Sequence, residues 1–161
     1  RDARPDIALT TDLIVGFPGE SDADFEQTLD LVQCAGFVDA FSFKYSARPG
    51  TAAADAADVV PESLKQERLE RLQDLLRGLT LAAHRSRVGE TVEVLVEGPS
   101  RHGGRQISGR DPHHRLVNLD RAAGAPVEPG SLVRVEIIEA LPRCLIGRLP
   151  DPARPSSPTS V

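Results

Sequence analysis

The stretch from Thr10 to Glu20 constrains the fold of this chain more than any other. Its apolar run from Leu13 to Val15 is continuous, which is typical of a parallel strand buried on both faces. A Gly-Phe-Pro-Gly turn follows, and Ser21 then has the features of a helix N-cap with acidic residues behind it. Because α/β sheets and barrels bind ligands where strands end and such loops begin, the turn is a candidate binding loop. A turn that only joins a strand to a helix fits the spacing equally well.

The first half of the sequence alternates between strand and helix patterns. Strands are expected at 7–15 and 37–45, with an amphipathic helix between them at 22–35. Strand, helix and strand in this order form a βαβ unit with parallel strands, and one such unit is too little sheet to cover its own faces. The expected helix buries residues at i, i+4 and i+7 and ends at a glycine; these residues are Phe25, Leu29, Val32 and Gly36.

A second, longer helix is expected from Pro61 to about Arg87. Its leucines recur at helical spacing, while arginine and glutamate occupy the other side, which favours a solvated surface over a binding site. Residues 1–86, which end with this helix, are interpreted as part of an α/β domain. The apolar stripe consists of Leu69, Leu72, Leu75, Leu76 and Leu79.

After Gly89 the apolar periodicity changes from helical to alternating. Short strands separated by turns indicate a small closed barrel of the oligonucleotide-binding kind over residues 87–150. The Pro- and Ser-rich tail, 151–161, is expected to be disordered. The five expected strands are 91–96, 106–109, 115–118, 132–137 and 144–147, with turns at Gly98-Pro99, Gly103-Gly104, Asp111-Pro112 and 128–130.

Positive charge is concentrated in one segment of the expected barrel. Residues 1–86 carry 9 Lys/Arg and 15 Asp/Glu, a net charge of −6, whereas 87–150 carry 9 Arg and 8 Asp/Glu, a net charge of +1. Within the barrel, 101–121 holds five arginines and three histidines against two aspartates. Because local concentration matters more than total charge for binding a polyanion, 101–121 is a candidate nucleic-acid surface.

Composition disfavours several classes of protein. No apolar run approaches the roughly 20 residues that a membrane span needs, and no signal peptide is expected. Cys34 and Cys144 lie far apart in apolar surroundings, so both are interpreted as reduced core thiols. His113 and His114 have no third ligand near them in the sequence, so no metal site is predicted. A cytoplasmic protein is the simplest interpretation.

Three segments of the first half are specific in combination: TDLIVGFPGE at 11–20, FEQTL at 25–29 and FSFKYSARPGT at 41–51. Together they resemble the radical S-adenosylmethionine methylthiotransferases. The β-rich part resembles the TRAM domain of that family, an RNA-binding barrel. The resemblance covers about 6–150. Three segments of the barrel resemble the branch that adds a methylthio group to C2 of N6-isopentenyladenosine beside the tRNA anticodon, namely 94–101, 107–110 and 115–118.

The resemblance implies a fold and a set of cofactors. Residues 1–86 would be the C-terminal part of a radical S-adenosylmethionine α/β barrel, and 87–150 a five-stranded, OB-like TRAM barrel. S-adenosylmethionine and [4Fe-4S] clusters would serve the whole enzyme. The cluster ligands, a CxxxCxxC motif, would lie upstream of Arg1, so this chain would hold no catalytic residue and be inactive alone. The expected partner is a tRNA anticodon stem-loop, bound by a monomer without membrane contact.

The resemblance also implies cofactor-binding residues. Ile14 would contact the adenine, while Gly16 and Gly19 would let the backbone approach the cofactor. Glu20 would either contact the cofactor or favour the following helix N-terminus. Backbone groups from Phe43 to Tyr45 would lie beside the same cofactor.

RNA-binding residues are implied in both parts. Arg48, in a turn after the second strand, would pair with an RNA phosphate or form a salt bridge inside its own loop. In the barrel, Asn118 would reach a base or sugar edge, and arginines would contact phosphates. These arginines are Arg101, Arg105, Arg110 and Arg115.

Two other functions remain open. One is a methylthiotransferase acting on threonylcarbamoyladenosine in tRNA or on a ribosomal protein. The other is a non-catalytic RNA-binding protein that keeps the TRAM barrel and a remnant of the catalytic domain. A CxxxCxxC motif in the reading frame upstream of Arg1 would support the enzyme.

Overall fold

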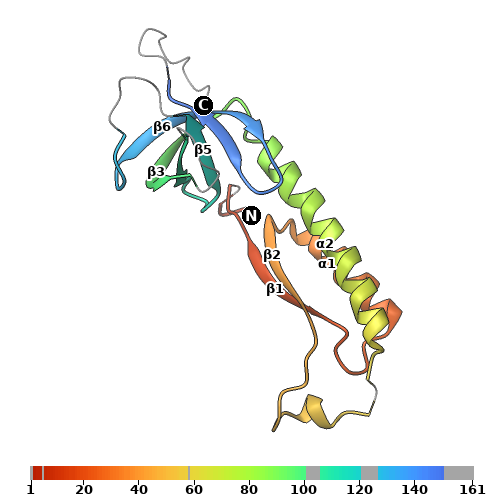
Figure 1. The fold of residues 1–161 in the computed structure, drawn as a ribbon. Helices are drawn as coiled ribbons and strands as arrows, with labels where there is room; N and C mark the ends of the chain where they lie inside the picture. The colour runs from red at the N-terminus through yellow and green to blue at the C-terminus, as the bar shows by residue number, and fades with distance from the viewer. Residues whose placement is uncertain (1, 5, 58, 101–105, 121–126, 151–161) are drawn as a thin grey trace. The chain divides into compact units, whose positions relative to one another are not determined.

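A computed structural model describes residues 2–4, 6–57, 59–100, 106–120 and 127–150, with the backbone alone for Asp120 (Figure 1). The chain forms two compact units, Arg1–Ala82 and Ala83–Val161. The domain boundary expected after residue 86 stays a prediction. The expected Gly103-Gly104 turn and the expected disordered tail at 151–161 lie outside the described residues.

The first unit contains the expected βαβ arrangement. Strands β1 (Thr10–Val15) and β2 (Asp39–Lys44) are parallel, with Thr10 opposite Asp39 and Val15 opposite Lys44. Helix α1 (Asp22–Ala35) connects them, and the short 3-10 helix η1 (Ala52–Asp55) precedes helix α2 (Glu62–Arg85). Both strands start later than expected, at Thr10 and Asp39, which are the first residues that pair between them. Within the described residues, no helix is both long and apolar enough to cross a lipid bilayer.

Local signals set both ends of α1. The Ser21 side chain accepts a hydrogen bond from the Asp24 N–H, and the Asp24 carboxylate accepts one from the Ser21 N–H, so the expected N-cap is confirmed as a capping box. Gly36 ends the helix at φ 64°, a left-handed conformation that a residue with a Cβ adopts less readily. The expected apolar stripe of Phe25, Leu29 and Val32 is buried.

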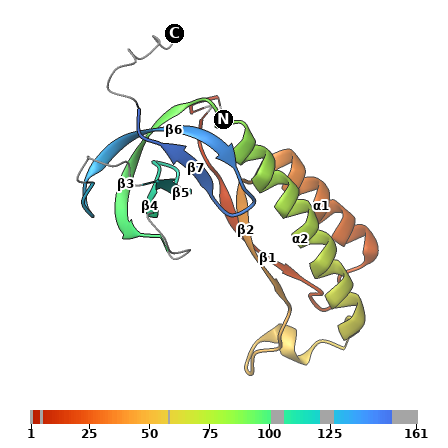
Figure 2. The same ribbon diagram turned by 45° about the horizontal axis from the view of Figure 1, so that its top comes forward.

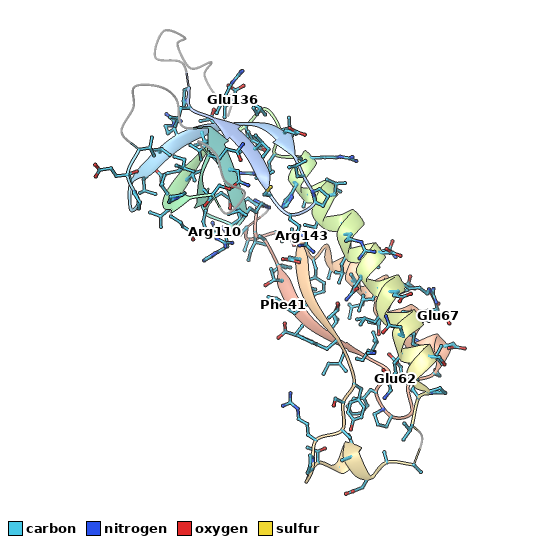
Figure 3. All side chains as sticks on the ribbon, in the orientation of Figure 1. Phe41, Glu62, Glu67, Arg110, Glu136 and Arg143 are labelled. Carbon is cyan, nitrogen blue, oxygen red and sulfur yellow. The ribbon has the colours of Figure 1, made fainter. Side chains whose placement is uncertain are left out.

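Helices α1 and α2 cover one face of the β1–β2 sheet (Figure 2). Val15 from β1, the stripe of α1, and Leu72 and Leu76 from α2 form the buried core of this unit. The opposite face exposes Ile14, Phe41 and Phe43, and Figure 3 shows Phe41 on it. The expectation that β1 is buried on both faces is therefore wrong for the described residues, because the two helices pack on only one side.

The cysteines differ from one another in burial. Cys144 is buried and Cys34 is exposed, and both are free thiols. The expectation of a core position is therefore wrong for Cys34. It lies two residues beyond Val32 on α1, which turns it about 200° away from the buried stripe at 3.6 residues per turn.

The second unit contains the five-stranded barrel, as expected. Its strands are β3 (Thr91–Pro99), β4 (Gln106–Arg110), β5 (Leu116–Asp120), β6 (Leu132–Ala140) and β7 (Leu145–Arg148). They close in the order β3-β4-β5-β7-β6, with every pair antiparallel except β5–β7. Strand β3 continues through Gly98-Pro99, where a turn was expected, because a bulge after Val96 lets Gly98 pair with Ser108.

Alternation along the strands fills the barrel. In β3, residues Val92, Val94 and Val96 point inward, while the residues between them are exposed. They pack against inward residues of the other four strands, among them the fully buried Leu119 and Ile137. The barrel therefore has its own hydrophobic core.

Candidate functional site

The candidate cofactor loop lies at the carboxyl ends of β1 and β2, which meet at one edge because the strands are parallel. Tyr45, just after β2, donates its N–H to the carbonyl of Val15 at the end of β1, 2.8 Å away. The rings of Phe17 and Tyr45 stand edge to face with centroids 5.0 Å apart. Gly16 and Gly19 have φ of 71° and 81°, a region that favours glycine, so the turn chemistry expected of this loop is present.

Two of the predicted cofactor residues are neighbours across the sheet. Ile14 pairs with Phe43, and both lie on the face turned away from the helices. Ile14 is 54% exposed and Phe43 is 52% exposed. They form an exposed apolar pair beside the glycine turn, and contact of Ile14 with adenine stays a prediction.

The Glu20 carboxylate is largely enclosed and faces its own loop. Its Oε2 accepts hydrogen bonds from the Gly16 N–H and from Nη1 of Arg68, the latter at 2.7 Å. The carboxylate therefore closes the loop by joining its first residue to α2. A contact between Glu20 and a cofactor stays a prediction.

Arg68 was missed by sequence reasoning, which placed the arginines of α2 on a solvated face. It is 2% exposed. Nη1 also donates to the Glu20 carbonyl at 3.1 Å, and Nη2 donates to Asp22 Oδ1 at 2.6 Å. Burial alone would lower the pKa of this guanidinium, but its hydrogen bonds and charge pairing with Asp22 and Glu20 outweigh that and raise it above the ordinary value. Arg68 is therefore a firmly held cation.

Lys65, also missed, lies one turn earlier on α2 and is buried as well. Its Nζ lies 3.5 Å from the carbonyl oxygen of Tyr45 and 5.6 Å from the centre of the Tyr45 ring. Its methylene stem passes so close to Gly16 that a Cβ there would overlap it. A signal was available in the sequence, because Arg68 and Lys65 precede Leu72 by one and two helical turns, on the same stripe.

Arg48 lies in a turn after β2, as expected. Its side chain is exposed, and its carbonyl accepts hydrogen bonds from the N–H and hydroxyl of Thr51 at 3.3 and 2.8 Å. Its role in RNA binding stays a prediction.

Arg110 is the described arginine of the candidate nucleic-acid surface that is best placed for solvent contact (Figure 3). Its side chain is 40% exposed, and it donates from Nε to Glu97 Oε1 at 3.3 Å and from Nη1 to the His114 carbonyl at 2.9 Å. Leu95 and Leu132 continue the same row across β3 and β6, and both are exposed. The row presents a cation beside apolar surface.

Arg115 is oriented differently. Its side chain is mostly buried and donates from Nη1 to Asp111 Oδ2 at 3.2 Å. The buried Asp111 also accepts, at Oδ1, the backbone N–H groups of His113 and Arg115. The Arg115 side chain thus braces the turn between β4 and β5, and its contact with phosphate stays a prediction.

Asn118 lies on the outer face of β5, because its neighbours Val117 and Leu119 point into the barrel core. It is buried, and its Oδ1 accepts a hydrogen bond from the Ser100 hydroxyl at 3.0 Å. In this position it ties β5 to the end of β3, and its contact with a base stays a prediction. Arg101 and Arg105 lie outside the described residues.

The described part of the chain contains no group of three His, Cys, Asp or Glu side chains placed to hold a metal ion. His113 and His114 lie in the segment between β4 and β5.

Comparison with known proteins identifies both parts of the chain. Residues 85–149 match the TRAM domain family. A tRNA-2-methylthio-N(6)-dimethylallyladenosine synthase from Magnetococcus marinus is 51% identical over 145 residues, which is 90% of this chain and 32% of that protein. Proteins of the same name from Novosphingobium aromaticivorans and Nocardia farcinica are 51% and 47% identical over 92% and 93% of this chain, and over 32% and 31% of their own length.

The chain thus spans about a third of the length of the relatives it matches. The resemblance seen in the motifs is confirmed over both units, not only over the barrel. This chain therefore carries a TRAM domain at residues 85–149. Along nine-tenths of its length it is homologous to tRNA-2-methylthio-N(6)-dimethylallyladenosine synthases, of which it matches about a third of the length of each.

Proposed function

We propose that this chain is the C-terminal part of a tRNA methylthiotransferase that adds a methylthio group to C2 of N6-isopentenyladenosine beside the anticodon. The observation that carries the proposal is 51% identity over nine-tenths of the chain to relatives named as synthases of 2-methylthio-N(6)-dimethylallyladenosine in tRNA. Dimethylallyl is another name for this isopentenyl group. Similarity through both units argues against a protein that shares only the RNA-binding barrel. The proposed enzyme is a cytoplasmic monomer.

The first unit would bind the cofactor and the barrel would bind the RNA. The loop from Gly16 to Glu20, with the exposed pair Ile14 and Phe43, would hold S-adenosylmethionine, since glycine backbone and an apolar face suit a nucleoside. The radical chemistry belongs to the cofactor and its [4Fe-4S] cluster, whose ligands would come from other parts of the enzyme. The barrel would bind the anticodon stem-loop.

Nucleoside analysis tests the proposed function. The complete gene, expressed in a strain that lacks its own methylthiotransferase, should restore 2-methylthio-N6-isopentenyladenosine in digested tRNA, measured by mass spectrometry. Restoration of the threonylcarbamoyl derivative instead would identify the other tRNA substrate. Unchanged tRNA with retained RNA binding would identify a non-catalytic RNA-binding protein.

Salt dependence tests the proposed RNA surface. Affinity of this chain for an anticodon stem-loop should fall with salt with a log–log slope of about −2 to −4, as expected for three or four phosphate contacts. Arg110→Ala should weaken binding to many sequences alike and reduce the slope by about one.

Arg148→Ala is the matched control. Arg148 is an exposed arginine of the same barrel, outside 101–121, and both its Nε and Nη2 are bound to Glu136 at 3.0 and 3.1 Å. Its replacement should leave the slope unchanged. Equal effects of the two substitutions would refute the assignment of the surface to residues 101–121.

A further inference from the structure

One turn of α2 carries two buried cations to the ends of both strands. Lys65 reaches Gly16 and the carbonyl of Tyr45, and Arg68 reaches the side chain and carbonyl of Glu20. We call Lys65 and Arg68 the α2 anchor. Within the described residues, the hydrogen bonds of the anchor side chains go to the candidate loop, the first residue of α1 and the end of β2.

The anchor places two charged side chains at buried positions of α2, which is energetically unfavourable without compensation. Lys65 and Arg68 lie on the stripe that otherwise carries Leu72 and Leu76 into the core. Burying a charge is unfavourable before its partners compensate, and apolar residues often stabilise such a position equally well. Stability alone therefore does not account for two cations here, whereas control of the loop does.

The contacts form a chain that leaves the loop little freedom. The Glu20 carboxylate binds the Gly16 N–H at the start of the loop and Arg68 on the helix. At Gly16, a positive φ and the underlying Lys65 stem together exclude a side chain. Arg68 also stacks on Phe25 of α1, with its guanidinium carbon 5.5 Å from the ring centre. The conformation of the loop therefore depends on its contacts with α2 and not on its own sequence alone.

We infer that Lys65 and Arg68 are positioning residues, which hold the loop from Gly16 to Glu20 and the end of β2 in the arrangement that binds S-adenosylmethionine. This inference rests on the proposed function. The anchor does not touch the cofactor; it acts through Glu20 and the loop backbone. Its loss should therefore weaken cofactor binding without weakening RNA binding.

The test measures S-adenosylmethionine binding by calorimetry on the full-length enzyme, purified without oxygen. Arg68→Met should raise the Kd about tenfold or more, whereas the affinity for the anticodon stem-loop should stay within about twofold. Arg68→Lys, which keeps the charge but loses the forked geometry, should fall between Arg68→Met and the wild type. On this chain, hydrogen exchange of the amides of Gly16, Phe17, Gly19 and Glu20 should accelerate in Arg68→Met.

Arg71→Met is the matched control. Arg71 lies one turn further along α2 and also stacks on Phe25, at 5.1 Å, but its ion pair goes to Glu26 on α1 and not to the loop. The Arg71→Met enzyme should bind S-adenosylmethionine with the same Kd as the wild type. If Arg68→Met fails to fold, Arg68→Lys and Lys65→Met provide the same comparison.

The outcomes separate the two proposals. A wild-type enzyme that binds S-adenosylmethionine, with Arg68 and Lys65 variants that bind it equally well, overturns the anchor alone. A wild-type enzyme that does not bind S-adenosylmethionine overturns the proposed function and the anchor with it. Equal losses in the Arg68 and Arg71 variants show that the helix packing, and not the anchor, is what matters.

Discussion

Replacing Leu119 by alanine is expected to lower the free energy of unfolding of the barrel by about 2–5 kcal/mol. Leu119 lies on β5, is fully buried, and packs in the barrel core against inward residues of the other strands. The substitution removes apolar contacts and leaves a cavity. Because the barrel is closed, its strands can move little to fill that cavity. Because native domains are stable by only about 5–15 kcal/mol, a loss of this size is large.

The stability of the barrel can be followed separately from that of the first unit. Trp is absent and the single Tyr is Tyr45 in the first unit, so tyrosine fluorescence reports on that unit, while hydrogen exchange of the β3–β7 amides reports on the barrel. Leu132→Ala is the control, since Leu132 is on the outer face of β6 and 62% exposed. It should change stability by less than about 0.5 kcal/mol. Similar losses for both leucines would contradict the described core.

Replacing Gly109 by alanine is expected to destabilise the barrel by about 1–3 kcal/mol, or more if the strands must separate. A Cβ at this inward position of β4 would stand 2.6 Å from Val94 Cγ1 and closer still to the Leu95 carbonyl oxygen. Backbone of β3 cannot move aside without breaking the pairing between β3 and β4. The loss should appear in chemical denaturation followed by circular dichroism.

Gly78→Ala is the matched control, with the opposite sign expected. Gly78 lies inside α2, and a Cβ there would meet no atom within 4 Å. Alanine favours a helix over glycine by roughly 0.5–1 kcal/mol, so this variant should be more stable than the wild type. A Gly109 variant as stable as the wild type would show that β3 and β4 are further apart than described.

Much of the fold was predictable because it depends on residues close in the sequence. The capping box at Ser21, the stop at Gly36 and the spacing of Phe25, Leu29 and Val32 define α1 locally. Likewise, alternation defines the barrel strands, and the motifs at 11–20, 25–29 and 41–51 indicate the family in combination. These features need no knowledge of what packs against them.

The tertiary structure decided which charged and polar side chains are buried and what they hold. Arg68 and Glu20 are 48 residues apart, and Ser100 and Asn118 are 18 apart, so neither pairing is visible in a local pattern. The same holds for Arg115, whose side chain turns to Asp111, and for Ile14, whose face the helices leave open. A sequence pattern shows which residues share one face of a helix or strand, but burial of that face depends on elements brought there by the fold.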